Sequence, residues 1–197
     1  AALMRRGMIF IRSQSPLPFV DHKTHHKFMN RPLLITLSLF CAAPGHAAEV
    51  KFKKHVLTEE FVAEGCNFAD FDHDGLIDMT AGCYIWHGPD FTRKTTFTPP
   101  SENASGPTKT PYDPAKGYSD YFLCYAYDFN TDSWADILVY GLPGEPALLY
   151  VNPKGKGGDW QKHNIFDVAD GESPDLKDVN GDGKPELLVH SSDPNKP

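Results

Sequence analysis

The chain alternates between short apolar runs and acidic segments. The runs lack the i, i+3, i+4 spacing of an amphipathic helix and are rich in β-branched and aromatic residues, so they predict strands. Three runs follow an acidic segment: "LIDMTAG" (76–82), "ADILVYG" (135–141) and "PELLVHS" (185–191). Extended segments precede two of them, "EGCNFAD" (64–70) and "FLCYAYD" (122–128). Each acidic segment is therefore predicted to join two strands.

Further runs supply third and fourth strands. They are "CYIWHG" (83–88), "TTFT" (95–98), "ALLYVN" (147–152) and "KHNIF" (162–166). The acidic segments begin at Asp70, Asp128 and Asp178, at steps of 58 and 50 residues. Four strands in a repeat of this length are typical of a β-propeller blade. The predicted fold is all-β, with blades of four antiparallel strands.

The expected blades cover residues 50–98 and 118–168, and a partial third blade covers 169–197. Residues 99–117 form a Pro-, Gly- and Ser-rich insertion between the first two blades, expected to be a surface or binding loop.

The three acidic segments share one pattern, with side-chain oxygens at positions 1, 3, 5 and 9. These residues are Asp70, Asp72, Asp74 and Asp78; Asp128, Asn130, Asp132 and Asp136; and Asp178, Asn180, Asp182 and Glu186. Such crowding of carboxylates is unfavourable without a cation, and Ca²⁺ takes six to eight oxygens in flexible geometry. Position 7 can add a backbone carbonyl, from Leu76, Trp134 or Lys184. The pattern predicts up to three Ca²⁺ sites; the alternative is a metal-free Asx turn.

Position 12 excludes an EF-hand, because Ala81, Val139 and Val189 have no side-chain ligand. Charge and turn chemistry also rank the three loops. The first has four carboxylates and Gly75, the third has three and Gly183, and the second has three and Ser133. Because glycine adopts the sharp turn at no steric cost, we expect affinity to fall in that order.

Three stretches carry a resemblance to a known family. "NFADFDHDGLIDMTAG", "AYDFNTDSWADILVYG" and "LKDVNGDGKPELLVHS" resemble the FG-GAP/VCBS repeats, the integrin-α-like blades of secreted bacterial proteins. The resemblance covers roughly residues 50–190. It implies a seven- or eight-bladed propeller with Ca²⁺ held by the loop residues named above. Because the chain holds fewer blades than that, we expect a partial propeller, truncated at its C-terminus.

The first 48 residues have a different character. Residues 29–48 combine a positive Arg31, an apolar stretch over 33–43 and small residues near Ala47, which predicts a secretory signal peptide. The alternative is a buried strand or helix. Residues 1–28 would then be an upstream, disordered extension. The expected location is secreted, periplasmic or at the cell surface, with no membrane span.

From Glu49 onward, the chain carries 13 Lys and Arg against 25 Asp and Glu. This acidic balance argues against nucleic acid as a partner. The predicted function is a secreted Ca²⁺-binding scaffold for a glycan or an extracellular protein, and the alternative is a propeller-based polysaccharide lyase or hydrolase. Candidate ligand contacts are Tyr84, Trp86, His87 and Trp134, which could equally be blade core.

No catalytic set is apparent in the sequence. Glu64 and Glu172 repeat at one position of the two units, which favours an architectural role over a catalytic one. Cys66, Cys83 and Cys124 leave two alternatives open, a disulfide between the first two or free buried thiols.

Overall fold

The computed structural model describes residues 8–13, 51–100, 104–105, 110–111, 113 and 119–192. Every named element within these residues is a β-strand. The chain divides into two compact units, Ile9–His55 and the remainder. The predicted signal peptide (29–48) lies outside the described residues.

A two-stranded sheet pairs β1 (Met8–Ser13) with β2 (Phe52–Thr58). The strand β1 lies within residues 1–28, the segment that the sequence predicts to be an upstream, disordered extension. The strand β2 also lies outside the sheet of the first blade, which begins at Asn67 rather than near residue 50.

The two complete blades are antiparallel four-stranded sheets, as the sequence predicts. The first follows the order β3 (Asn67–Ala69), β4 (Asp78–Ala81), β5 (Tyr84–His87), β6 (Arg93–Thr96). The second follows the order β9 (Leu123–Tyr127), β10 (Asp136–Tyr140), β11 (Glu145–Val151), β12 (Gln161–Ala169). Each strand pairs with its neighbour in sequence, so only short connections are needed. Between the blades, β7 (Ala104–Ser105) and β8 (Thr110–Pro111) form a small ladder.

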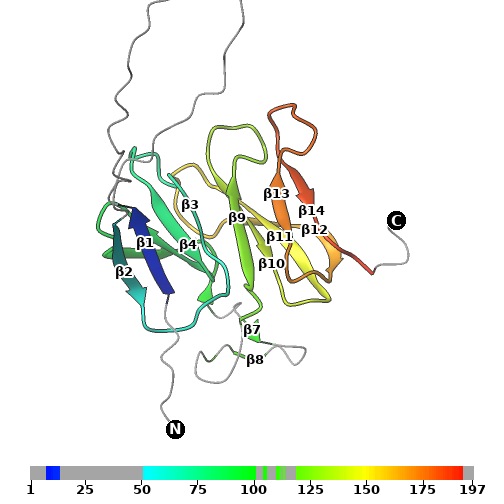
Figure 1. Cartoon of the computed structure of the whole chain (residues 1–197), viewed down its shortest axis with the longest axis horizontal. Coiled ribbons are helices and arrows are strands. Elements are labelled where there is room, and N and C mark those ends of the chain that lie inside the picture. Colours follow the sequence, from blue (N-terminus) through cyan, green and yellow to red (C-terminus); the bar gives the residue numbers. More distant parts are fainter. Residues whose placement is uncertain are drawn as a thin grey trace, which may run out of the picture. The chain divides into compact units, whose positions relative to one another are not determined.

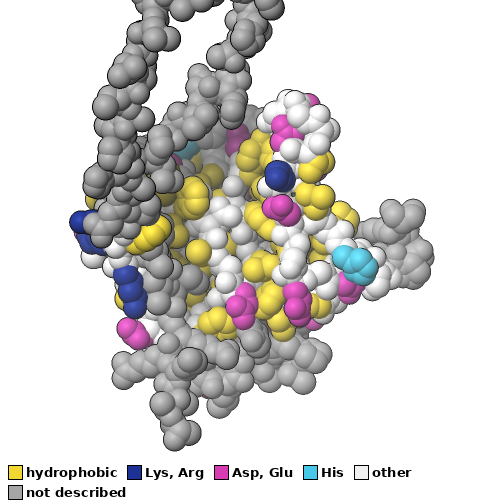
Figure 2. Space-filling view, viewed as in Figure 1, with side chains coloured by type: hydrophobic (Ala, Val, Ile, Leu, Met, Phe, Trp, Pro, Cys, Tyr) yellow, Lys and Arg dark blue, Asp and Glu magenta, His cyan; other side chains and the backbone are white. Residues whose placement is uncertain are grey.

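The third repeat contributes an antiparallel pair, β13 (Asp175–Lys177) and β14 (Glu186–Leu188). The loop between them projects at the upper right of Figure 1, and acidic side chains gather on it in Figure 2. This pair has the position of the first two strands of a blade.

The second sheet lies between the other two (Figure 1). Every residue of β10 is buried, because one face of the strand packs on the first blade and the other on the third repeat. Ile137 and Val139 join the cluster shared with Ile85, whereas Leu138 and Tyr140 belong to the cluster on the opposite face. The alternation follows from the two-residue period of a strand.

Aromatic rings fill the contact between the first two blades. Phe97, just beyond β6, is fully buried, and its ring lies edge-on to Tyr150 with centroids 4.9 Å apart. Tyr121 contacts both rings, and its hydroxyl lies 2.9 Å from the Tyr150 hydroxyl, so the buried phenols satisfy each other.

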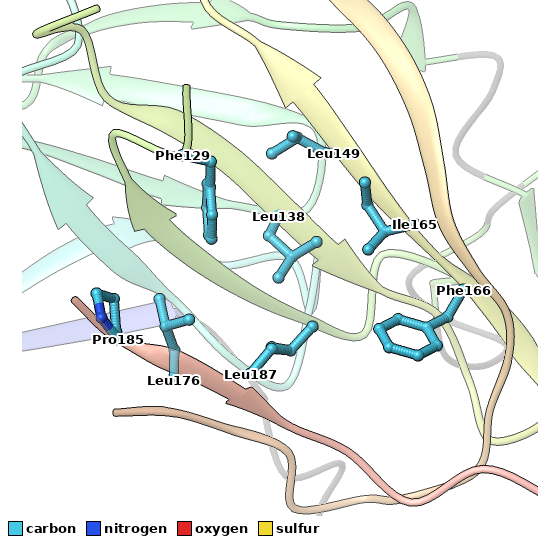
Figure 3. Close-up of a pocket in the computed structure, with 8 residues that line it drawn as sticks. All are labelled: Phe129, Leu138, Leu149, Ile165, Phe166, Leu176, Pro185 and Leu187. Atoms are coloured by element: carbon cyan, nitrogen blue, oxygen red, sulfur yellow. The ribbon is translucent and has the colours of Figure 1, made fainter. Parts of the chain in front are cut away.

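The contact between the second sheet and the third repeat is looser. It contains a partly open apolar pocket of about 250 Å³ (Figure 3). The side chains that line it are Phe129, Leu138, Leu149, Ile165, Phe166, Leu176, Pro185 and Leu187. Apolar side chains of the third repeat, including Leu187, therefore line one side of this pocket.

We predict that Phe97→Ala lowers the free energy of unfolding by about 3–5 kcal/mol, because it leaves a cavity between two blades. Urea denaturation monitored by tryptophan fluorescence measures the change. Phe68→Ala is the matched control, since Phe68 is 62% exposed on β3 and its truncation leaves no cavity. Equal effects of the two variants would contradict the proposed core.

Candidate metal centre

Each acidic loop places its fourth and sixth residues in the left-handed region. The φ angles are 59° at His73 and 85° at Gly75, 60° at Thr131 and 73° at Ser133, and 82° at Gly181 and 88° at Gly183. The three loops therefore share one tight coil. In this coil, alternate side chains turn toward the loop's interior.

The carboxylate at position 1 of each loop closes the coil. One oxygen of Asp70 accepts the N–H of Gly75 at 3.0 Å. The equivalent bonds join Asp128 to Ser133 and Asp178 to Gly183, both at 2.8 Å. The bond spans five residues in every loop and holds the turn at position 6.

In the first two loops, the carboxylate at position 9 is buried and joins the loop to the sheet. Asp78 is fully buried; its Oδ2 accepts the N–H of Phe71 at 3.1 Å and its Oδ1 that of Gly88 at 2.9 Å. Asp136 is equally buried and accepts the N–H groups of Phe129 and Asn152. Burial raises the pKa of both carboxyl groups, and the backbone donors oppose that rise.

Part of this role was missed in the sequence. Position 9 was expected only to bind metal, whereas its carboxylate also fixes the third strand of the blade. The donors, Gly88 and Asn152, follow β5 and β11, so only the paired sheet reveals them.

The first loop has the strongest indication of a bound cation. Asp70 Oδ1 and Asp72 Oδ1 are buried oxygens without a hydrogen-bond donor. Together with Asp74, these residues offer ligand atoms within 4.8 Å of one another. An unsatisfied buried acceptor costs about 1–3 kcal/mol, and a hard cation would satisfy both oxygens. The donor set therefore fits Ca²⁺.

The other two loops differ in charge. Asp178, Asp182 and Glu186 form a similar cluster in the third loop, whereas no such carboxylate group is found among the described residues of the second. There, the Lys154 ammonium lies 3.1 Å from Asp132 Oδ2. The Lys154 charge reduces the negative field of that loop. The order of affinity among the three loops stays a prediction.

The four candidate ligand contacts fall in different places. Trp86 and His87 are 3% and 5% exposed, so neither presents a surface to a ligand. Tyr84 is half-buried, with the Lys94 ammonium 4.4 Å from its ring centroid. Trp134 is half-buried and stacks on His73 at 3.8 Å, which links the first two loops. The expected group of four is therefore not one site.

The three cysteines beyond residue 48 are free thiols: Cys66 is exposed, whereas Cys83 and Cys124 are buried. Burial raises the pKa of Cys83 to about 11 and that of Cys124 to about 12. The buried pair therefore has little thiolate character.

A second feature lies at the opposite end of β9 from the Asp128 loop. It is an open groove, lined by Glu64, Phe122, Leu123, Leu142, Pro143 and Glu172. Glu64 and Glu172, the two carboxylates that repeat in sequence, are both exposed in this groove. It combines apolar surface with hydrogen-bond acceptors.

Comparison with protein families gives one match. Residues 128–189 match a family model described as an FG-GAP-like repeat. This segment is therefore similar to the FG-GAP-like repeats. The matched segment runs from the second acidic loop through the third, so it includes both loops and the strands β10 to β14. No curated protein and no solved structure gives a significant match.

The match and the sheets agree on an all-β, propeller-type scaffold. FG-GAP-like repeats often bind Ca²⁺, and the acidic clusters have side chains able to hold a metal. A search of the described residues for a helix that is long and apolar enough to cross a membrane finds none.

We predict that Ser133→Gly stabilises the fold by about 1 kcal/mol, because a non-glycine residue at φ 73° is strained. The reciprocal change, Gly183→Ala, should destabilise it by a similar amount. A Cβ at Gly183 would meet no atom within 4 Å, so backbone strain alone is tested. Chemical denaturation without divalent cations gives both values. Destabilisation by Ser133→Gly would contradict the shared coil.

Proposed function

We propose that this protein is a secreted, Ca²⁺-binding β-propeller scaffold that recognises a glycan or an extracellular protein. The observation that carries the Ca²⁺ proposal is the pair of buried, donor-free oxygens of Asp70 and Asp72 in the first loop. The ligands proposed for Ca²⁺ are the loop residues at positions 1, 3, 5 and 9, with the backbone carbonyl of position 7.

The ion would act as a structural staple. Each loop joins the first two strands of a blade, and its position-9 carboxylate is bonded to backbone groups in the loop and, in the two complete blades, beside the third strand. Two buried carboxylates, Asp78 and Asp136, also need a nearby positive charge. Ca²⁺ therefore stabilises the blade, and a ligand would bind elsewhere on the scaffold.

The groove that contains Glu64 and Glu172 is the surface that we propose for ligand binding. Carboxylates accept hydrogen bonds from sugar hydroxyls or from basic side chains, and Leu142 and Pro143 add apolar contact area. The two negative charges favour a neutral or basic ligand over an anionic one. The acidic loops and the groove lie at opposite ends of the strands. Ca²⁺ that fixes the loops would therefore also help to keep the groove rigid.

We predict that Ca²⁺ raises the melting temperature relative to EGTA. An ion that binds only the folded state adds about 2.7 kcal/mol per site at a hundredfold excess over Kd, which corresponds to about 5–10 °C. Asp70→Asn and Asp178→Asn should each reduce this difference, because they remove charge and keep an acceptor. Asp159→Asn, an exposed position outside the loops, is the control. Identical melts in Ca²⁺ and EGTA would refute the proposal.

We also predict that Glu64→Gln combined with Glu172→Gln abolishes ligand binding without changing the Ca²⁺-dependent melt. The change removes two charges from the proposed groove and keeps its shape. A glycan array and binding to immobilised cell-surface material, each done with wild type and variant, measure the effect. Undiminished binding by the variant would place the ligand surface elsewhere.

A further inference from the structure

His87, at the end of β5, is a buried histidine with one unsatisfied nitrogen. Its side chain is 6% exposed, and its Nε2 lies 2.8 Å from Thr95 Oγ1. Its Nδ1 makes no hydrogen bond, although it lies 3.2 Å from Asp72 Oδ2 and 3.3 Å from Asp78 Oδ2. A buried polar nitrogen thus faces two carboxylates without the geometry of a hydrogen bond.

The second blade shows that the architecture does not require this histidine. Gly88 in the first blade and Asn152 in the second donate the same hydrogen bond to the position-9 carboxylate. The residues before them, His87 and Val151, therefore occupy equivalent positions. The cross-strand neighbours of these two residues are Arg93 in the first blade and Gln161 in the second.

Position 3 of the loop follows the same trend, with Asp72 in the first blade and Asn130 in the second. The second blade is therefore built with neutral residues at all three places. The first blade has a carboxylate, an imidazole and a guanidinium there, and Arg93 bonds Asp72 Oδ2. This concentration of charge adds nothing to the sheet that the second blade lacks.

We propose that Asp72, Asp78 and His87 form a site for a borderline divalent cation such as Zn²⁺, beside the Ca²⁺ loop. Their ligand atoms lie within 4.8 Å of one another. Zinc binds imidazole nitrogen and carboxylate oxygen at about 2.0–2.1 Å, which separates neighbouring ligands of a tetrahedral ion by about 3.3 Å. The two nitrogen–oxygen distances match that separation, and a metal ion would satisfy Nδ1.

The site shares Asp72 and Asp78 with the proposed Ca²⁺ ligands, but it uses the Oδ2 atoms of both, which face His87. The donor-free oxygens of the loop are Oδ1 of Asp70 and Oδ1 of Asp72, whereas His87 faces Oδ2 of Asp72. Asp72 would bridge the two ions through its two oxygens. A carboxylate has about four lone-pair positions, so Oδ2 can accept the Arg93 guanidinium and still bind metal. The mixed nitrogen and oxygen set selects against Ca²⁺, which prefers oxygen alone.

Isothermal titration of Zn²⁺ into the full chain at saturating Ca²⁺ tests the proposal. The background is a variant with His22, His25 and His26 changed to Ala, because these histidines offer competing nitrogen ligands. In that background, we change His87 and Asp72 to the residues that the second blade has at these positions. His87→Val and Asp72→Asn should each weaken Zn²⁺ binding at least about tenfold. His163→Val, an exposed histidine on β12, should leave it unchanged.

Cobalt absorption supplies a second readout. Bound Co²⁺ should show visible d–d bands that disappear in His87→Val, while the Ca²⁺-dependent melt of that variant persists. Equal Zn²⁺ affinity in His87→Val and wild type would overturn the site, as would stoichiometric release of Zn²⁺ by Ca²⁺. A failure of Ca²⁺ to stabilise the chain would instead refute the Ca²⁺ proposal and leave the zinc measurement to stand separately.

Discussion

The buried carboxylate at position 9 of the first two acidic loops, Asp78 or Asp136, is the interaction on which a complete blade depends. In the two complete blades, the carboxylate accepts the N–H of the second loop residue and that of the residue after the third strand. One side chain therefore positions the loop, its own strand and the end of the third strand. Its burial has an energetic cost, because a charge in the interior needs compensation. The backbone donors supply part of this compensation. The proposed cation would supply the rest, so metal binding and blade geometry are coupled.

The blades differ most in how they supply positive charge. Arg93 pairs with Asp72 in the first loop, and Lys154 pairs with Asp132 in the second. The first loop still has two buried oxygens without donors, whereas the second brings together no comparable carboxylate cluster within the described residues. Repeats that share one backbone coil can therefore differ in metal affinity. Side chains from the fourth strand of the first blade, Arg93, and from the loop after β11, Lys154, make that difference.

The same sheets separate the loop end of the scaffold from the groove that we propose for ligand binding. The acidic loops follow the first strand of each blade, and the groove with Glu64 and Glu172 lies at the other end of β9. Between these ends, β10 is buried on both faces, and aromatic rings fill the first inter-blade contact. A rigid, packed sheet can thus fix the shape of the groove. The acidic loops need not contact a ligand for this.

The sequence by itself determined the all-β class, the strands of each blade and the spacing of the loops. Alternating oxygens around a turn, and short apolar runs without helical spacing, are local patterns that survive without tertiary contacts. The environment of His87 and Trp86 was decided only by the folded sheets, because burial depends on which blade faces pack together. The partners of Asp78 and Asp72 were likewise decided by strand pairing, which brings Gly88 and Arg93 to a loop that lies 10 to 21 residues earlier in the chain.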